Sequence, residues 1–283
     1  MAKHKIKVGI IGGSGLSDPA NLIFKYKSEI PQEDARNEFG RPSSALQEGT
    51  IAGVDVVLLS RHGPGHKITP TSVNYRANIE SLRLAGCTHI LASTACGSLS
   101  ESISRGQLVI PDSFIDRTIH RKGTFYDGTS QNYPGVCHVP MEPAFDPRTS
   151  QVLEDAAAKI GAPVRRGGTI VSIEGPRFSS KAESNMFRQW GGHLINMTTC
   201  PEVILAKEAG MLYAAVAIAT DYDCWRDATD TVCAADVLTV FKKNVGKVTQ
   251  LLVQAVELLG QEKWDDHIDS LKNVLKTNNV SSH

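Results

Sequence analysis

Residues 212–225 read LYAAVAIATDYDCW. The first eight are an unbroken apolar run, which is the pattern of a strand buried on both faces of a sheet. Asp221 and Asp223 follow this run almost at once. Ligands of open α/β proteins bind beyond the carboxyl ends of the strands, and carboxylates held there are poorly solvated. We therefore expect this acidic pair to bind a ligand or to titrate.

Short apolar runs alternate with helical patterns along the rest of the chain. The predicted strands are 7–11, 54–60, 89–93, 107–110, 168–173, 193–195 and 212–219. The predicted helices are 72–85, 147–160, 179–190, 201–209, 234–259 and 264–276. This alternation predicts an α/β fold with a central parallel or mixed β-sheet flanked by helices. No repeat or linker divides the chain, so we expect a single domain over residues 1–283, with the helices of about 234–276 part of it and a disordered tail at 277–283.

The composition excludes several classes of protein. Hydrophobic residues make up 41% of the 283 residues, and 30 basic side chains balance 30 acidic ones, so nothing indicates binding to nucleic acid or to a membrane. The first apolar run is broken by Lys7 and Gly9 and indicates a strand rather than a signal peptide, and no run approaches the roughly 18 residues of a membrane span. The six cysteines lack metal-finger spacing and a secretory context. We expect reduced thiols, no metal site and a cytoplasmic protein, with the nucleus left open as a second compartment.

A glycine-rich turn, Gly12-Gly13-Ser14-Gly15, follows the first predicted strand. Glycines let backbone N–H groups approach an anion, and the Ser14 hydroxyl adds a donor, which is the chemistry of a phosphate cradle. The turn is not a Walker loop, because no Lys-Ser/Thr pair follows at the required spacing. Asp18 stands where a dinucleotide fingerprint needs its last glycine. A tight turn that merely needs glycine is the alternative.

Arginine and histidine gather on a second loop, which follows the predicted strand 54–60. Arg61, His62 and His66 lie there among glycines and a proline, and their side chains suit an oxyanion. A solvated basic loop is the alternative.

Two more polar segments follow predicted strands. Ser93 to Leu99 is expected to be a turn of small residues that exposes N–H groups. Cys96 within it is interpreted as a buried thiol rather than a nucleophile, because no activating partner is adjacent. Ile195 to Thr199 supplies an amide, a soft apolar surface and two hydroxyls.

Taken in order, these segments resemble the trimeric purine nucleoside phosphorylase family, and most closely its 5′-methylthioadenosine phosphorylase branch. The resemblance runs from about Lys7 to about Leu259. Its most specific blocks are Gly12 to Leu16, Arg61 to Gly63, Asn74 to Asn78, Thr94 to Leu99, Glu174 to Ser180, Asn196 to Thr198 and Thr220 to Trp225. The resemblance implies a mixed-sheet α/β fold, a homotrimer, and phosphorolysis of 5′-methylthioadenosine to adenine and 5-methylthioribose 1-phosphate. Phosphate is then a co-substrate, and no cofactor is implied.

The resemblance also implies site residues, position by position. The phosphate site falls on Ser14, Arg61, His62, Thr94, Ala95 and Thr198. The substrate-binding positions fall on Phe178, Asn196, Met197, Asp221, Tyr222 and Asp223, with Met197 against the sugar and Phe178 near the base. The pocket for the 5′-methylthio group falls on Ala234, Val237 and Leu238, completed by a neighbouring subunit through His138. Ala234 is smaller than the valine typical of its position, which widens the expected pocket.

The chemistry of the implied reaction assigns the acid. Cleaving an N-ribosidic bond builds positive charge on the sugar and negative charge on the leaving purine. Asp221 is the candidate catalytic residue, because burial and the neighbouring Asp223 favour a protonated carboxyl that can donate to purine N7. Oxopurine enzymes of the family carry Asn at this position and Glu in place of Ser179, so both residues are expected to select a 6-aminopurine. An acidic helix cap after a strand is the alternative.

Two other functions stay open. A purine nucleoside phosphorylase acting on 6-oxopurine nucleosides such as inosine or guanosine would differ at Ser179 and Asp221. A dinucleotide-binding oxidoreductase or a catalytically silent nucleotide sensor rests only on the glycine turn, whose missing third glycine argues against it.

Overall fold

The computed structural model of the protein describes residues 3–13, 24–226 and 233–280, and these ranges contain one sheet of eleven strands. The strands are β1 (Lys7–Gly12), β2 (Lys25–Ile30), β3 (Leu46–Ile51), β4 (Val54–Ser60), β5 (His89–Ser98), β6 (Leu108–Ile110), β7 (Ser113–Arg117), β8 (Val164–Arg166), β9 (Thr169–Ile173), β10 (Leu194–Asn196) and β11 (Leu212–Asp221). The helices are α1 (Tyr75–Leu84), α2 (Pro147–Lys159), α3 (Lys181–Gln189), α4 (Thr199–Glu208), α5 (Ala234–Gln261) and α6 (Asp265–Thr277), with a 3₁₀ turn at Pro70–Ser72.

The sheet is mixed, and helices flank it, so the predicted fold class is confirmed. β1 runs parallel to β4 and β5, and β5 runs parallel to β11. β10 joins β5 in the antiparallel sense, and β2, β3 and β4 form an antiparallel meander. The carboxyl ends of β5 and β11 therefore lie side by side.

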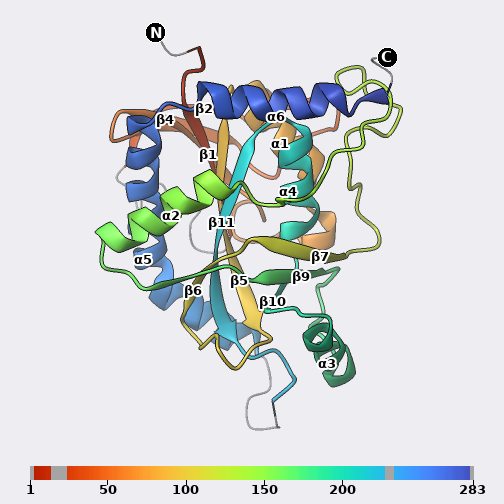
Figure 1. The fold of residues 1–283 in the computed structure, drawn as a ribbon, viewed down its shortest axis with the longest axis vertical. Coiled ribbons are helices and arrows are strands. Elements are labelled where there is room, and N and C mark those ends of the chain that lie inside the picture. Colours follow the sequence, from red (N-terminus) through yellow and green to blue (C-terminus); the bar gives the residue numbers. More distant parts are fainter. Residues whose placement is uncertain (1–2, 14–23, 227–232, 281–283) are drawn as a thin grey trace.

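Helices cover both faces of the sheet (Figure 1). α2 and α5 pack on one face around Val216 and Leu252, and α1 and α4 pack on the other around Ile79 and Val203. α6 crosses the end of the sheet at which β5 and β11 begin. Its neighbour Trp264 is buried there, with its ring centroid 4.5 Å from that of His89. None of the helices in the described ranges is long and apolar enough to cross a bilayer.

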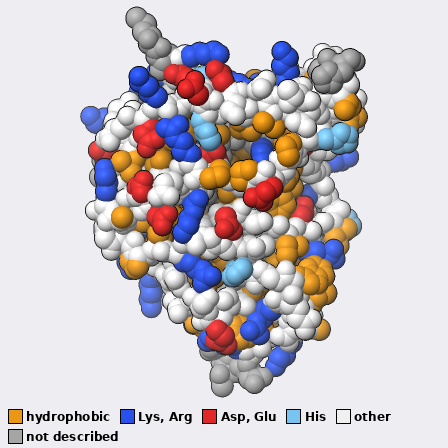
Figure 2. Space-filling model, in the orientation of Figure 1, with side chains coloured by type: hydrophobic (Ala, Val, Ile, Leu, Met, Phe, Trp, Pro, Cys, Tyr) orange, Lys and Arg blue, Asp and Glu red, His pale blue; other side chains and the backbone are white. Residues whose placement is uncertain are grey.

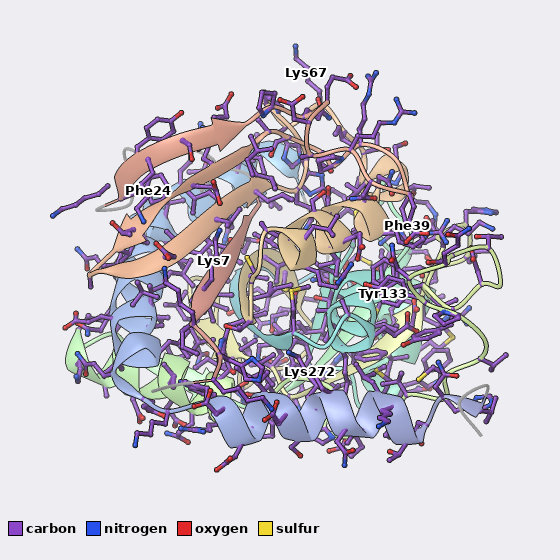
Figure 3. The ribbon with its side chains drawn as sticks, turned by 90° about the horizontal axis from the view of Figure 1, so that it is seen from above. Lys7, Phe24, Phe39, Lys67, Tyr133 and Lys272 are labelled. Atoms are coloured by element: carbon purple, nitrogen blue, oxygen red, sulfur yellow. The ribbon has the colours of Figure 1, made fainter. Side chains whose placement is uncertain are left out.

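A hollow lies below α6, with hydrophobic side chains beside it (Figure 2). It corresponds to a cavity of about 300 Å³ between α6, the end of α4 and residues 140–147. Leu212 and Tyr213, at the start of β11, form part of its wall. The length of β11 separates this cavity from Asp221. Seen from above, α6 with Lys272 lies across the molecule from the loop that carries Lys67 (Figure 3).

The two central strands run further than predicted. β5 continues to Ser98 and β11 continues to Asp221, with a register shift between Ala219 and Asp221. The expectation of a turn at Ser93 to Leu99 was wrong as far as Ser98, because this backbone pairs with β11 up to Gly97 and with β10 at Gly97 and Ser98. Small residues and hydroxyls are typical of turns, and the sequence of this segment does not indicate that it pairs with a strand distant in the chain.

Four strands, β2, β3, β7 and β8, were not predicted. β2 is an exposed strand at the edge of the sheet with the sequence KYKSEI, and lysines at such an edge discourage pairing with other chains. Its polar composition hid it from a search for apolar runs.

Part of the tail is paired with the rest of the chain. The N–H of His138 donates to the carbonyl of Asn278 at 3.0 Å, and the N–H of Val280 donates to the carbonyl of Val136 at 3.0 Å. Residues 278–280 thus differ from the disorder expected of them, and residues 281–283 lie outside the described ranges.

Candidate active site

A cavity of about 350 Å³ opens at the carboxyl ends of β5 and β11. Its walls come from the loop after β4, from β5, from β10 and the residues after it, from the end of β11 and from the first turns of α5. The lining residues are Gly13, Arg61, His62, His66, Pro70, Thr94, Ala95, Cys96, Gly97, Ile173, Pro176, Phe178, Ile195, Asn196, Met197, Thr198, Thr220, Asp221, Asp223, Val237, Leu238 and Phe241. Strand-end residues that are far apart in the sequence therefore meet in one place.

Two carboxyl groups face this cavity. Asp221 ends β11, where its Oδ2 accepts a hydrogen bond from the Thr220 hydroxyl at 2.8 Å and its Oδ1 accepts one from the Asp223 N–H at 2.7 Å. Asp223 has a positive φ of 51°, so the chain turns sharply between the two residues. This turn holds both carboxyl groups at the cavity.

Gly97 allows the sheet to approach Asp221 closely. A Cβ at this position would lie 2.9 Å from Asp221 Oδ1 and 2.9 Å from Ile195 Cγ2, closer than real Cβ atoms come. Because no side chain fits there, a glycine in β5 is required for Asp221 to sit where it does.

Asp223 is the more deeply buried acid, with 4% of its surface exposed. Burial raises the pKa of Asp223, and the charge of Asp221 adds to this effect, while the Ser184 and Ser179 hydroxyls act in the opposite direction. The Asp223 carboxyl therefore stays protonated to a higher pH than an exposed aspartate does. The assignment of the catalytic proton to Asp221 stays a prediction.

Arg61 lines the cavity but is only 2% exposed. Its Nε donates to Glu202 Oε2 at 2.6 Å, its Nη2 donates to Glu202 Oε1 at 2.7 Å, and its Nη1 donates to the Ser93 carbonyl at 3.1 Å. Burial disfavours the guanidinium charge, but Glu202 outweighs burial and the pKa of Arg61 is raised. Of the two terminal nitrogens, Nη1 lies beside the Cβ position of Gly13, at 3.6 Å.

His62 is held in one tautomer. Its Nδ1 lies 2.8 Å from the Ile68 carbonyl oxygen, which can only accept, so Nδ1 carries the hydrogen. Burial and the charge of Arg61 lower the pKa of His62 to about 4, and the ring is neutral at pH 7. Its Nε2 is then an acceptor rather than a donor.

The Asn196 side chain is occupied by the protein. Its Nδ2 donates to Thr94 Oγ1 at 2.9 Å and to Thr199 Oγ1 at 2.7 Å, and its Oδ1 accepts from Ser172 Oγ at 2.8 Å. This amide orients the Thr94 hydroxyl, which also lines the cavity. Thr198, which is 6% exposed, adds a second hydroxyl group to the same wall.

The remaining wall is mostly apolar. Phe178, Met197, Val237 and Leu238 line it, and Phe178 is 39% exposed, which is unlike a core phenylalanine. Cys96 is 2% exposed, and burial raises the pKa of its thiol to about 12. This environment fits the predicted buried thiol and does not fit a nucleophile.

Three predicted residues do not line the cavity. Tyr222 packs edge to face against Trp225, with 6.3 Å between ring centroids. Ser179 accepts a hydrogen bond from Cys224 Sγ on its carbonyl at 3.1 Å. His138 is exposed in the segment paired with Asn278.

Two further predicted site residues cannot be placed relative to the cavity. Ser14 lies outside the described residues, and Ala234 begins α5 with a side chain that is not described. Among the described residues, no group of three or more His, Cys, Asp or Glu side chains is placed to hold a metal ion.

Sequence reasoning missed Arg121, which is 1% exposed. Its Nη1 donates to the carbonyls of Met197 at 2.6 Å and Cys200 at 2.7 Å, and its Nη2 donates to the carbonyl of Glu174 at 2.6 Å. One guanidinium thus ties together the two segments that carry Met197 and Phe178. Its Nε also pairs with the Glu174 carboxylate at 3.2 Å. No motif or spacing marks such a residue, because its partners are distant in the sequence.

Comparison with known proteins identifies the family. The model of the phosphorylase superfamily matches residues 7–257. The S-methyl-5′-thioadenosine phosphorylase of Anopheles gambiae is 56% identical over 279 residues, which cover 99% of this chain and 98% of that protein. The chain belongs to the S-methyl-5′-thioadenosine phosphorylases. A second S-methyl-5′-thioadenosine phosphorylase, from Danio rerio, is 51% identical and matches 95% of this chain and 94% of its own length.

Solved structures agree with this assignment. Methylthioadenosine phosphorylase from Schistosoma mansoni in complex with adenine has a TM-score of 0.92 and 41% identity, covering 98% of this chain and 100% of that one. A Schistosoma mansoni adenosine/methylthioadenosine phosphorylase variant in complex with methylthioadenosine has a TM-score of 0.89 and 40% identity, over 98% and 99% of the two chains. The predicted family and fold are confirmed, and the phosphorylase fold spans almost all of this chain.

Proposed function

We propose that the protein catalyses the phosphorolysis of 5′-methylthioadenosine to adenine and 5-methylthioribose 1-phosphate, a step of methionine and purine salvage. The observation that carries the proposal is that hydroxyl and guanidinium donors share one cavity with an acidic pair. The activity named for relatives at 51% to 56% identity supports it.

The reaction needs an anion and an acid. A phosphate oxygen attacks C1′ of the sugar while the bond between C1′ and N9 breaks, and the electron pair of that bond passes to the purine. A proton donated to N7 neutralises the leaving base, and we assign this donation to Asp221, the first carboxyl of the acidic pair. Asp223 accepts from the exocyclic amine when ionised.

The phosphate is proposed to bind Ser14, Arg61, His62, Thr94, Ala95 and Thr198. Because the His62 ring is neutral, its Nε2 accepts a hydrogen bond from a protonated phosphate oxygen. Arg61 supplies the only full positive charge among these six residues.

The nucleoside is proposed to lie with its sugar against Met197 and its base near Phe178. The methylthio group would lie against Val237, Leu238 and Ala234, and a neighbouring copy of the chain would contribute its His138. We propose a homotrimer in the cytoplasm, to be tested by analytical ultracentrifugation and by fractionation of cytoplasm and nucleus.

One incubation tests the activity. Pure protein with phosphate and 5′-methylthioadenosine should release adenine, and inosine under the same conditions should release little hypoxanthine. Inosine turnover without adenine release would instead indicate an oxopurine enzyme. No turnover of either nucleoside would contradict the proposed activity.

A further inference from the structure

Glu202 is a buried acid outside the cavity, and it contacts Arg61, which lines the cavity. It lies on α4, is 1% exposed, and is not among the lining residues. Its two oxygens accept from Nε and Nη2 of Arg61 at 2.6 and 2.7 Å. A bidentate pair of this kind fixes the plane of the guanidinium as well as its position.

Tyr213 supports the same carboxylate from behind. Its hydroxyl donates to Glu202 Oε1 at 2.8 Å, and the residue is 3% exposed on β11. Burial, followed by the charge of Glu202, raises the pKa of Tyr213 well above its usual value, so this hydroxyl stays a donor. Tyr213, Glu202 and Arg61 form a chain of hydrogen bonds that ends at the cavity.

This chain determines which part of Arg61 can bind a ligand. Nε and one hydrogen of Nη2 are occupied by Glu202, and one hydrogen of Nη1 is occupied by the Ser93 carbonyl. Nη1 and Nη2 each retain a second hydrogen, and of the two nitrogens Nη1 lies beside Gly13, which lines the cavity. Without the carboxylate, the guanidinium would keep the Ser93 carbonyl but lose the two hydrogen bonds that fix its plane.

We propose that Glu202, supported by Tyr213, is a positioning residue that presents Arg61 Nη1 to the phosphate co-substrate. The proposal rests on the proposed function, because it takes phosphate as the ligand of Arg61. Glu202 also offsets much of the Arg61 charge, so binding of the anion depends on an oriented hydrogen bond more than on a free charge. A loss of Glu202 would therefore weaken phosphate binding even though it removes a negative charge.

The test measures the phosphate and nucleoside dependence of Glu202→Gln and Tyr213→Phe separately. Gln keeps the shape of Glu but places an NH₂ group against one Arg61 donor. We expect kcat/KM for phosphate to fall about 10- to 100-fold for Glu202→Gln and about 3- to 10-fold for Tyr213→Phe. The KM for 5′-methylthioadenosine at saturating phosphate should change less than about twofold, as expected of an interaction that the nucleoside does not share.

The chain offers two matched controls. Glu208 is another buried acid of α4, which accepts from Thr124 Oγ1 at 2.8 Å and from the Phe125 N–H at 2.7 Å. Tyr133 is another buried tyrosine that donates to a buried acid, Glu80, at 2.6 Å. Tyr133 lies beside Phe39 on the α1 side of the sheet (Figure 3). Glu208→Gln and Tyr133→Phe should leave the phosphate dependence unchanged.

A second readout does not require turnover. Inorganic phosphate alone should raise the Tm of the wild-type protein, since a ligand that binds the folded state stabilises it. This rise should shrink in Glu202→Gln and Tyr213→Phe and persist in both controls. If the wild-type protein gains Tm with phosphate but cleaves no nucleoside, the proposed function fails while the role of Glu202 is still decided.

Folded variants at both positions with wild-type phosphate dependence would overturn the proposal. Equal losses for phosphate and nucleoside would also overturn it, because they would indicate a general structural role. If Glu202→Gln does not fold, Tyr213→Phe decides alone, since it removes one hydroxyl and keeps the ring that packs 5.9 Å from Phe145 between centroids.

Discussion

The backbone N–H of Asp223 donates a 2.7 Å hydrogen bond to Oδ1 of Asp221, so one turn orients both acids of the cavity. The bond also ties the conformation of the turn to the position of the first carboxyl group. A change at either residue is therefore expected to affect the other, and the two should be tested by different measurements.

Asp221→Asn should cut kcat for adenine release by about 100- to 10,000-fold, the usual contribution of a general acid. With its single oxygen at the Oδ1 position, an asparagine keeps the hydrogen bond from the Asp223 N–H. Its NH₂ group then faces the Thr220 hydroxyl, which can accept from it, but it has no acidic proton to give to N7. The measurement is the pre-steady-state rate of adenine formation. A rate within about threefold of the wild type would remove Asp221 from the role of proton donor.

Asp223→Asn should change the pH dependence of stability. Because burial raises the pKa of Asp223, this carboxyl holds its proton more fully in the folded protein than in the unfolded chain between its ordinary pKa of 3.8 and the raised pKa. The unfolding free energy of the wild type therefore falls as pH rises from 3.8 to the raised pKa, and the Asp223→Asn variant does not share this loss. The stability gain of the variant over the wild type should be absent below pH 3.8 and grow with pH, as followed by urea unfolding.

Asp55→Asn provides a control of opposite sign for that experiment. Hydrogen bonds from Lys27 and Lys5 lower the pKa of Asp55 to about 2. Its contribution to stability is present above the ordinary pKa of 3.8 and is lost as pH falls toward 2. The Asp55 variant should therefore be less stable than the wild type near neutral pH, and this difference should vanish in acid. Parallel pH profiles for the two variants would contradict the assignment at Asp223.

Much of the fold was predictable because buried strands and amphipathic helices leave a local pattern. β4 was predicted with its observed bounds, and every predicted helix is present. The missed strand β2 and the extension of β5 from Ser93 to Ser98 are defined by backbone pairing with other strands rather than by side-chain pattern. Composition alone does not specify such pairing.

The site was predictable where function requires particular side chains near strand ends. Asp221 and Arg61 lie in one cavity as expected. Glu202 and Arg121 were missed, because each acts through a partner that is distant in the sequence. The raised pKa of Asp223 was not predictable either, because its main cause is burial, which only the fold reveals.

The double variant Ser179→Glu, Asp221→Asn should gain phosphorolysis of inosine and lose that of 5′-methylthioadenosine. Sites that hydrogen-bond a polar group discriminate by about 10⁴- to 10⁵-fold, so reversing both positions should invert the ratio of kcat/KM values for the two nucleosides. Ser179 does not line the cavity, but its hydroxyl is near Asp223, and a longer acid there can reach the base. Ser179→Ala, which adds no acceptor, is the control and should not turn over inosine.

Arg121→Lys should destabilise the protein by about 3 to 5 kcal/mol, because it disrupts the pair between Arg121 Nε and Glu174 Oε1 at 3.2 Å and leaves buried carbonyls without a donor. The guanidinium reaches the carbonyls of Met197, Cys200 and Glu174 from two nitrogens, and a single ammonium cannot span them. Urea unfolding measures the loss, and the KM for 5′-methylthioadenosine should rise in the same variant because the Met197 segment is no longer held.

The matched control is Arg177→Lys. Arg177 pairs with Glu183 at 2.7 Å, but its side chain is 70% exposed, and exposed pairs contribute about 1 kcal/mol or less. If both lysine variants lost the same small amount of stability, the buried guanidinium would not be what joins the two walls of the cavity. A large loss of stability in the Arg121 variant alone, together with a higher KM for 5′-methylthioadenosine, would show that one residue outside every sequence motif holds the Met197 and Phe178 segments in place.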